Sequence, residues 1–247
     1  MKSSLYSSPI YDNVYSKAAI NRIEKQRQKI RHDALQFLNK KRKLQIIDFP
    51  ENKVFDYSPH KDDLLDLGKS KGVFIAKNLR KNEDLNKKYN LRVFHILSFY
   101  DSKRRNISTC LTFLKYFCKA EMGRIGIVSI TNDNKLGIPG IEPYLDIFYK
   151  YGIQEHNILI RKNVEKAFKA GDGDGYWMNK SKPKYQGPTF SIHVPLKYGA
   201  DIKNYENKEE WLEVAECGIG GNIEGGFDFG MERIELYFFG VAFPRNK

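Results

Sequence analysis

Apolar side chains recur along residues 16–38 at the spacing of one helix face. Ser16 can cap the start of this segment, and no Gly or Pro interrupts it. At about 100° per residue the apolar side chains form a single stripe, which Arg27 weakens. The stripe consists of Ile20, Ile23, Ile30, Ala34, Phe37 and Leu38. This pattern predicts a long amphipathic helix whose apolar stripe docks on another surface.

After residue 43 the pattern changes to short apolar runs separated by turn residues. At residues 189–196 apolar and polar side chains alternate, as a half-buried strand requires. The regular turn signals favour antiparallel strands over alternating strand–helix units. Apolar runs lie at residues 44–49, 54–57, 73–76, 91–100, 107–118, 125–130, 158–160, 189–196, 211–217 and 234–243, and short helices are expected at 62–67, 142–151 and 164–170.

These elements predict a mainly β protein with some helix (α+β). We expect a single domain, residues 1–247, with an antiparallel β-sandwich body and a few short helices. A Tyr-rich leader and a basic helical arm, residues 1–43, precede the body, residues 44–247. A chain of 247 residues is long enough to bury the core of such a domain.

The positive charge of the chain is concentrated in the predicted arm. The net charge is +12, and the segment from Lys17 to Lys43 holds ten bases against Glu24 and Asp33. Such a segment can bind nucleic acid by releasing counterions, or it can dock its apolar stripe on a neighbouring subunit. Aromatic side chains just ahead of it would suit single-stranded nucleic acid; these are Tyr6, Tyr11 and Tyr15. Both interpretations stay open.

Three polar or glycine-rich segments lack the spacing of a binding motif. Asp172 and Asp174 alternate like the start of a calcium loop, but no Glu follows at the required distance. Residues 218–230 hold six glycines without the Gly-Lys-Ser/Thr ending of a phosphate loop, so a surface loop is expected. The bases at residues 103–105 suit a solvated hairpin end better than a phosphate site.

The histidines and cysteines also lack a motif. No His lies at ligand spacing from another His or Cys, so we expect no metal site and no catalytic residues. His95 and His193 should point outward from strands. The odd number of cysteines indicates free thiols in a reducing compartment. The residues concerned are His32, His60, His95, His156, His193, Cys110, Cys118 and Cys217.

No segment approaches the ~18–20 apolar residues that span a bilayer. The first nine residues lack the apolar centre of a signal peptide. We therefore expect an intracellular chain without a membrane partner.

The layout of the whole chain resembles that of a known family. The matching features are the Tyr-rich leader, the helix after Ser16, the run HVPLKY at residues 193–198 and the run FGVAF at residues 239–243. With these features the chain resembles the cypovirus polyhedrins, the occlusion-body proteins of insect viruses. The basic run at residues 40–43 and the glycine-rich residues 218–230 depart from that resemblance.

The resemblance implies a structural protein that is not an enzyme and requires no cofactor. Its copies would form trimers that pack, through the assembly arm, into a crystal lattice around virus particles in the host-cell cytoplasm. The resemblance also implies bound nucleotides, at residues that no motif identifies. Strong alkali ionises Tyr and neutralises Lys, so it would reverse the net charge and dissolve the crystals. The alternative is a basic RNA-binding protein of a virus or phage, and an enzyme assembled from scattered residues is a third possibility.

Overall fold

The computed structural model of the chain describes residues 16–48, 54–55, 71–79, 93–101, 103–170, 172–173, 175–178 and 186–241. The predicted N-terminal helix is confirmed as α1 (Lys17–Arg42). The backbone N–H of Ala19 donates to Oγ of Ser16, at 3.3 Å, which caps its first turn. Lys43 adopts a left-handed conformation, and its N–H donates to the carbonyl of Asn39 to end the helix.

The described strands form one mixed sheet of eleven strands rather than two packed sheets. Neighbouring strands are parallel at β1/β3, β2/β3 and β5/β6 and antiparallel elsewhere. Along the sheet the order is β1 (Gln45–Ile46), β3 (Gly72–Leu79), β4 (Val93–Tyr100), β11 (Gly226–Gly230), β10 (Trp211–Gly218), β9 (Gln186–Pro195), β5 (Gly126–Ile130) and β6 (Ile158–Arg161). Beside this path, β2 (Val54–Phe55) pairs with β3, and β8 (Tyr176–Met178) joins β7 (Asp172–Gly173) to β9.

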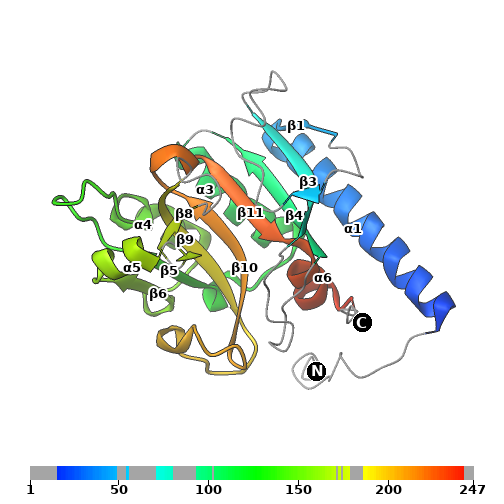
Figure 1. Cartoon of the computed structure of the whole chain (residues 1–247). Helices are drawn as coiled ribbons and strands as arrows, with labels where there is room; N and C mark the ends of the chain where they lie inside the picture. The colour runs from blue at the N-terminus through cyan, green and yellow to red at the C-terminus, as the bar shows by residue number, and fades with distance from the viewer. Residues whose placement is uncertain are drawn as a thin grey trace.

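Most of the longer helices pack against one face of this sheet, and the helix Val164–Ala170 packs instead with Ile130 and Tyr176 in a separate cluster. The longer ones are α3 (Lys103–Thr112), which continues into the π-helical turn η1 (Phe113–Phe117), α4 (Leu145–Tyr151), α5 (Val164–Ala170) and α6 (Met231–Phe239). Short 3-10 turns are η2 (Met122–Arg124), η3 (Glu142–Tyr144), η4 (Glu155–Asn157), η5 (Ile202–Asn204) and η6 (Gly221–Ile223). In Figure 1, α1 and α6 lie side by side at one end of the sheet, and α4, α5 and β6 lie at the other end.

The main core lies between the sheet and these helices. Rings from neighbouring strands stack there, with the centroids of Phe99 and Phe227 5.2 Å apart. Phe113 of η1 packs on Phe229, with centroids 4.8 Å apart. The stripe of α1 reaches the same core, because Ile30, Ala34 and Leu38 are buried in it.

The prediction of a β-sandwich with a projecting helical arm is therefore wrong. The sheet has a single layer of strands, and helices cover the face that a second sheet would have covered. α1 is not an arm, since its apolar stripe packs on the sheet of the same chain. The boundary between arm and body, and the single domain, stay predictions.

Two segments predicted as strands are helices. Residues 107–118 lie in α3 and η1, and residues 234–239 lie in α6. A short apolar run that is buried on several sides has no clear period, so helix and strand cannot be told apart by pattern. The loop predicted at residues 218–230 is wrong too, because it contains β11, a central strand. The expected helices at 142–151 and 164–170 are confirmed, and residues 62–67 lie outside the described residues. No helix in the described part of the chain is long and apolar enough to cross a membrane.

Candidate functional site

One side of α1 packs against the core, and the opposite side faces solvent. Its buried side carries Arg27, Ile30, Ala34 and Leu38. Its opposite side, here called the basic face, is exposed along its length. The basic face consists of Arg22, Lys25, Lys29 and Lys40, with His32 and Gln36 between them. At 1.5 Å per residue the face spans about 27 Å.

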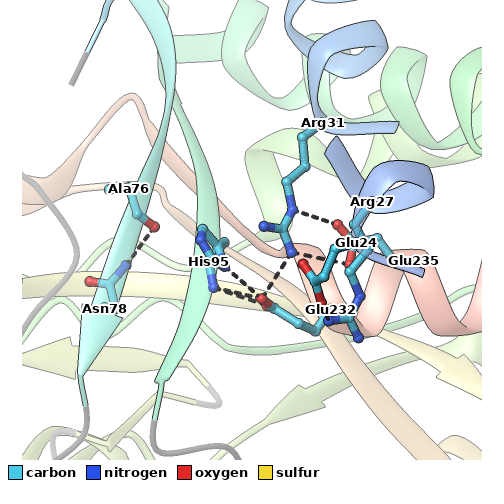
Figure 2. Close-up of polar contacts among 8 residues, drawn as sticks. All are labelled: Glu24, Arg27, Arg31, Ala76, Asn78, His95, Glu232 and Glu235. Atoms are coloured by element: carbon cyan, nitrogen blue, oxygen red, sulfur yellow. Dashed lines mark hydrogen bonds and ion pairs between the residues drawn. The ribbon is translucent and has the colours of Figure 1, made fainter. Parts of the chain in front are cut away.

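Two arginines of α1 point inward and are neutralised by carboxylates of α6 (Figure 2). Nε of Arg31 donates to Oε1 of Glu235 at 2.7 Å, and its Nη2 donates to Oε1 of Glu232 at 3.1 Å. Nε of Arg27 lies 3.4 Å from Oε2 of Glu235, and its Nη1 donates to Glu24 at 2.8 Å. These inward charges are compensated within the chain, so the positive potential of α1 belongs to its basic face.

His95 of β4 completes this ionic cluster from the sheet. Its backbone N–H and its Nδ1 lie 2.9 and 2.8 Å from the carboxylate of Glu232. Burial alone would raise the pKa of Glu232, but the hydrogen bonds from His95 and the charge of Arg31 lower it below its usual value. The pKa of Glu235 is raised, because burial outweighs the hydrogen bond and charge of Arg31. The cluster therefore fixes α1 to α6 and β4.

The sheet face that points away from the helices carries a row of polar side chains. Phe227 and Phe229 point into the core, so Asp228 between them points to the other face. Four residues stand opposite one another in register across β4, β11, β10 and β9, namely Ser98, Asp228, Glu216 and Ser191. Oγ of Ser98 donates to Asp228. Two carboxylates directly opposite each other repel, so this row favours a cationic or hydrogen-donating neighbour.

Arg233 lies beside the two middle strands of this polar row, β10 and β11. It belongs to the first turns of α6, and a Cβ at Gly230 would lie 3.5 Å from its Cδ. Its Nη1 donates to the backbone carbonyl of Glu213 at 2.9 Å. Gly226 and Gly230 flank Asp228 on the same face of β11, where the side chains of Tyr100 and Arg233 lie over them. This arrangement brings the carboxylates of Asp228 and Glu216 near Arg233, which also pairs with the carboxylate of Glu213 at 3.4 Å.

His193 was expected to point outward, and this prediction is wrong. The side chain is fully buried beside Tyr205, and its Nε2 lies 2.9 Å from Oγ of Ser191. Burial lowers the pKa of His193 to about 4, so the imidazole is neutral at pH 7. The predicted alternation on β9 is confirmed, but Ile202 and Tyr205 of the loop between β9 and β10, with Trp211 at the start of β10, cover this end of the second face.

The structure divides the predicted assembly residues into two groups. Ile30, Ala34 and Leu38 are buried in the core of this chain, and Ile23 and Phe37 pack against it. Ile20 is 45% exposed. A contact of this stripe with a second copy stays a prediction, and it concerns the exposed first turns of α1.

The remaining candidates are placed as follows. Arg105 pairs with Asp101 at 3.0 Å and starts a helix rather than a hairpin end. The three cysteines are buried free thiols, and burial raises the pKa of each. Asp174 and the side chain of Asp172 lie outside the described residues. Within the described ranges no three His, Cys, Asp or Glu side chains could hold a metal ion.

The sequence interpretation missed Arg233, Asp228 and the carboxylate partners of α1. One signal was available for the partners: Arg27 and Arg31 lie four residues apart, and Glu232 and Glu235 lie three apart. Both spacings put two charges on one helix face, which suits two oppositely charged helices.

No family model and no curated protein matches the chain. Among solved structures, an aspartyl-tRNA synthetase from Entamoeba histolytica shares 11% identity with it, with a TM-score of 0.44 over 91% of this chain and 56% of that chain. A histidyl-tRNA synthetase of S. aureus, in its apo form, shares 11% identity, with a TM-score of 0.47 over 96% of this chain and 71% of that chain. The chain thus spans about half the length of the first. With TM-scores below 0.5, the likeness carries no argument about the site.

These comparisons contradict the resemblance to polyhedrins. Both solved structures are aminoacyl-tRNA synthetases, and neither is an occlusion protein. The prediction of a crystal-forming viral occlusion protein that dissolves in alkali is therefore wrong. The expectation that the chain is not an enzyme is contradicted as well, since both solved structures are named as synthetases.

Proposed function

We propose that this chain is an RNA-binding protein whose basic face on α1 contacts the phosphates of the RNA. The observation that carries the proposal is the arrangement of charge on α1. Lys29 of the basic face pairs with Asp33 at 2.7 Å, an exposed pair that solvent screens. Arg22, Lys25 and Lys40 have no acidic partner within the described residues. Their charges are available to a polyanion.

The rest of the basic face supports RNA over a membrane surface. A helix that lies on a membrane needs apolar side chains on the face that enters the lipid. Here the exposed side chains between the bases are polar, with His32 and Gln36 in line with Lys29 and Lys40. Such side chains can donate to or accept from ribose 2′-hydroxyls, which distinguish RNA from DNA. Both solved structures are named as tRNA synthetases, but the proposal rests on the charges of α1 alone.

The test replaces three bases of the basic face by acids. The variant Arg22→Glu/Lys25→Glu/Lys40→Glu should weaken binding to RNA at least about tenfold and lower the slope of log K against log salt concentration by about 2 to 3. The matched control is Lys197→Glu/Lys203→Glu/Lys208→Glu, which changes the net charge equally at exposed positions of the β9–β10 loop. Equal losses in both variants, or equal affinity of the wild type for DNA and RNA, would overturn the proposal.

A second candidate function is binding of a nucleotide on the polar face of the sheet. The specific observation is the position of Arg233 over Gly230, beside the row of Ser98, Asp228 and Glu216. An arginine can contact phosphate or stack on a base, and the carboxylates can accept from ribose or base N–H groups. Calorimetric titration with ATP should show binding that Arg233→Ala abolishes and Arg22→Ala retains. Equal binding to both variants would contradict this site.

A further inference from the structure

The last turn of α1 is tied to the neighbouring helix α3 through Arg42, which lies outside the basic face. Arg42, in the last turn of α1, donates through Nε to Oγ1 of Thr109 at 2.6 Å and through Nη2 to Oγ of Ser108 at 2.5 Å. In return, Nη2 of Arg105 donates to the carbonyl of Arg42 at 2.8 Å. Arg105 is exposed. These hydrogen bonds fix the C-terminal end of α1 to α3.

A further hydrogen bond joins α3 to α4. The carbonyl of Ser108 accepts from Oγ1 of Thr112 at 2.6 Å and from the hydroxyl of Tyr151 at 3.0 Å. Nζ of Lys115 lies 5.9 Å from the ring centroid of Tyr151 and 5.9 Å from that of Tyr116. A lysine held between two rings keeps its position by cation–π attraction.

Tyr116 is the exposed member of this group. Its side chain is 61% exposed, although its neighbours Phe113 and Phe117 pack into the core or against it. An exposed ring gains nothing from burial within the chain. Lys115, which is half-buried, lies against its ring, and Lys119, three residues later, and Lys150 of α4 are exposed. The acids near these residues in the described chain include Asp101, paired with Arg105, Glu121, paired with Arg124, and Asp146 of α4.

We infer that the helices α3, η1 and α4 bind an unpaired segment of the RNA, with one base stacked on Tyr116. This inference rests on the RNA binding proposed above and names the kind of RNA. Rings interleaved with lysines suit single strands, because an unpaired base offers its flat face to a side chain. In a duplex the bases are stacked on one another, and only phosphates and groove edges are accessible. Phosphates on either side of the stacked base would contact Lys115 and the bases at the end of α1.

The experiment measures the affinity of four proteins, the wild type and three variants, for a single-stranded RNA and for a duplex of the same length. Tyr116→Ala should weaken binding to the single strand at least about fivefold and leave binding to the duplex unchanged. Tyr116→Phe keeps the ring and should keep the affinity. The matched control is Tyr198→Ala, which removes a tyrosine that is 95% exposed in the β9–β10 loop, and it should also keep the affinity.

The outcomes separate the two proposals. If the wild type binds neither RNA, the RNA-binding function itself fails. If it binds RNA through the basic face of α1 but Tyr116→Ala changes nothing, or weakens both RNAs equally, only the stacking on Tyr116 fails. If Tyr198→Ala weakens binding to the single strand as much as Tyr116→Ala does, the contact is an unspecific effect of exposed tyrosines and the inference is overturned.

Discussion

At the scale of single residues, the charged side chains of α1 that face the core differ from those that face solvent in burial and in the strength of their ion pairs. Arg27 is almost fully buried and lies between Glu24 and Glu235, whereas Lys29, two residues later, is exposed and pairs only with Asp33. A buried charge that loses its partner destabilises the fold strongly, while an exposed pair contributes little. The same residue types on one helix thus have different tasks: the buried ones hold the fold, and the exposed ones are available for a ligand.

Removing the charge of Glu235 should therefore destabilise the chain. Glu235 is fully buried and contacts both Arg27 and Arg31. We expect Glu235→Gln to lower the free energy of unfolding by about 3 kcal/mol, because two arginines lose their shared carboxylate. Glu24→Gln removes a partner of Arg27 that is largely exposed and should change the free energy by less than about 1 kcal/mol. Urea unfolding of the two variants measures both values, and similar losses would contradict the assigned role of Glu235.

At the scale of elements, α1 was predicted with its cap and its apolar stripe, and most strands of the sheet were placed near their true positions. The pattern failed for α3 with η1, for α6 and for β11. Residues of α3 and α6 are buried on several sides, so their apolar side chains show no clear period. β11 begins and ends with a glycine and has Asp228 between two Phe, so its sequence resembles that of a loop. Its place in the sheet depends on β4 and β10, which are distant in sequence.

The candidate site could be predicted only in part, because it too depends on contacts between residues that are distant in sequence. The charge of α1 is local information, so the basic segment was found. The direction in which each arginine points depends on partners such as Glu235, which lies 204 residues from Arg31. The exposure of Tyr116 depends on how α3 and α4 pack, and the spacing of residues in the sequence does not predict that packing.

The docking of α1 gives a prediction at this scale. Ile30 is buried in the core, whereas Ile20, on the same stripe, is 45% exposed. Ile30→Asp should lower the free energy of unfolding by at least about 3 kcal/mol, because it places a charge among apolar side chains. Ile20→Asp should change it by less than about 0.5 kcal/mol. Thermal unfolding of both variants is the measurement, and a stable Ile30→Asp protein would show that α1 does not hold the sheet.

At the scale of the whole molecule, the two faces of the sheet differ in what covers them. Helices cover one face with a large aromatic core, while the other face has small apolar clusters at its ends and polar side chains in register between them. The proposed RNA surface lies on the helices and the proposed nucleotide site on the opposite face. A ligand on either face would contact different elements of one rigid sheet.

Stability of the whole fold should depend on pH through His193. Burial lowers its pKa in the folded chain to about 4, from about 6.5 in an unfolded chain. The unfolded chain therefore takes up the proton first, and the contribution of neutral His193 is complete above pH 6.5 and is lost as the pH falls to 4. Its expected size is about 3 kcal/mol. In His193→Gln the loss of stability between pH 7 and pH 4 should be smaller by this amount, as measured by urea unfolding at each pH. A parallel loss in both proteins would exclude His193 as the source.

The central position of β11 has a consequence for how the chain folds. Ser98 of β4 and Asp228 of β11 pair across 130 residues, and β10, on the other side of β11, comes late in the chain as well. When the ribosome has made the first half of the chain, one edge of β4 has no partner, and long-range pairs of this kind close slowly. An unpaired edge next to an aromatic surface is prone to aggregation. Newly made copies therefore expose this edge of β4 until β11 has been synthesised and has paired with it.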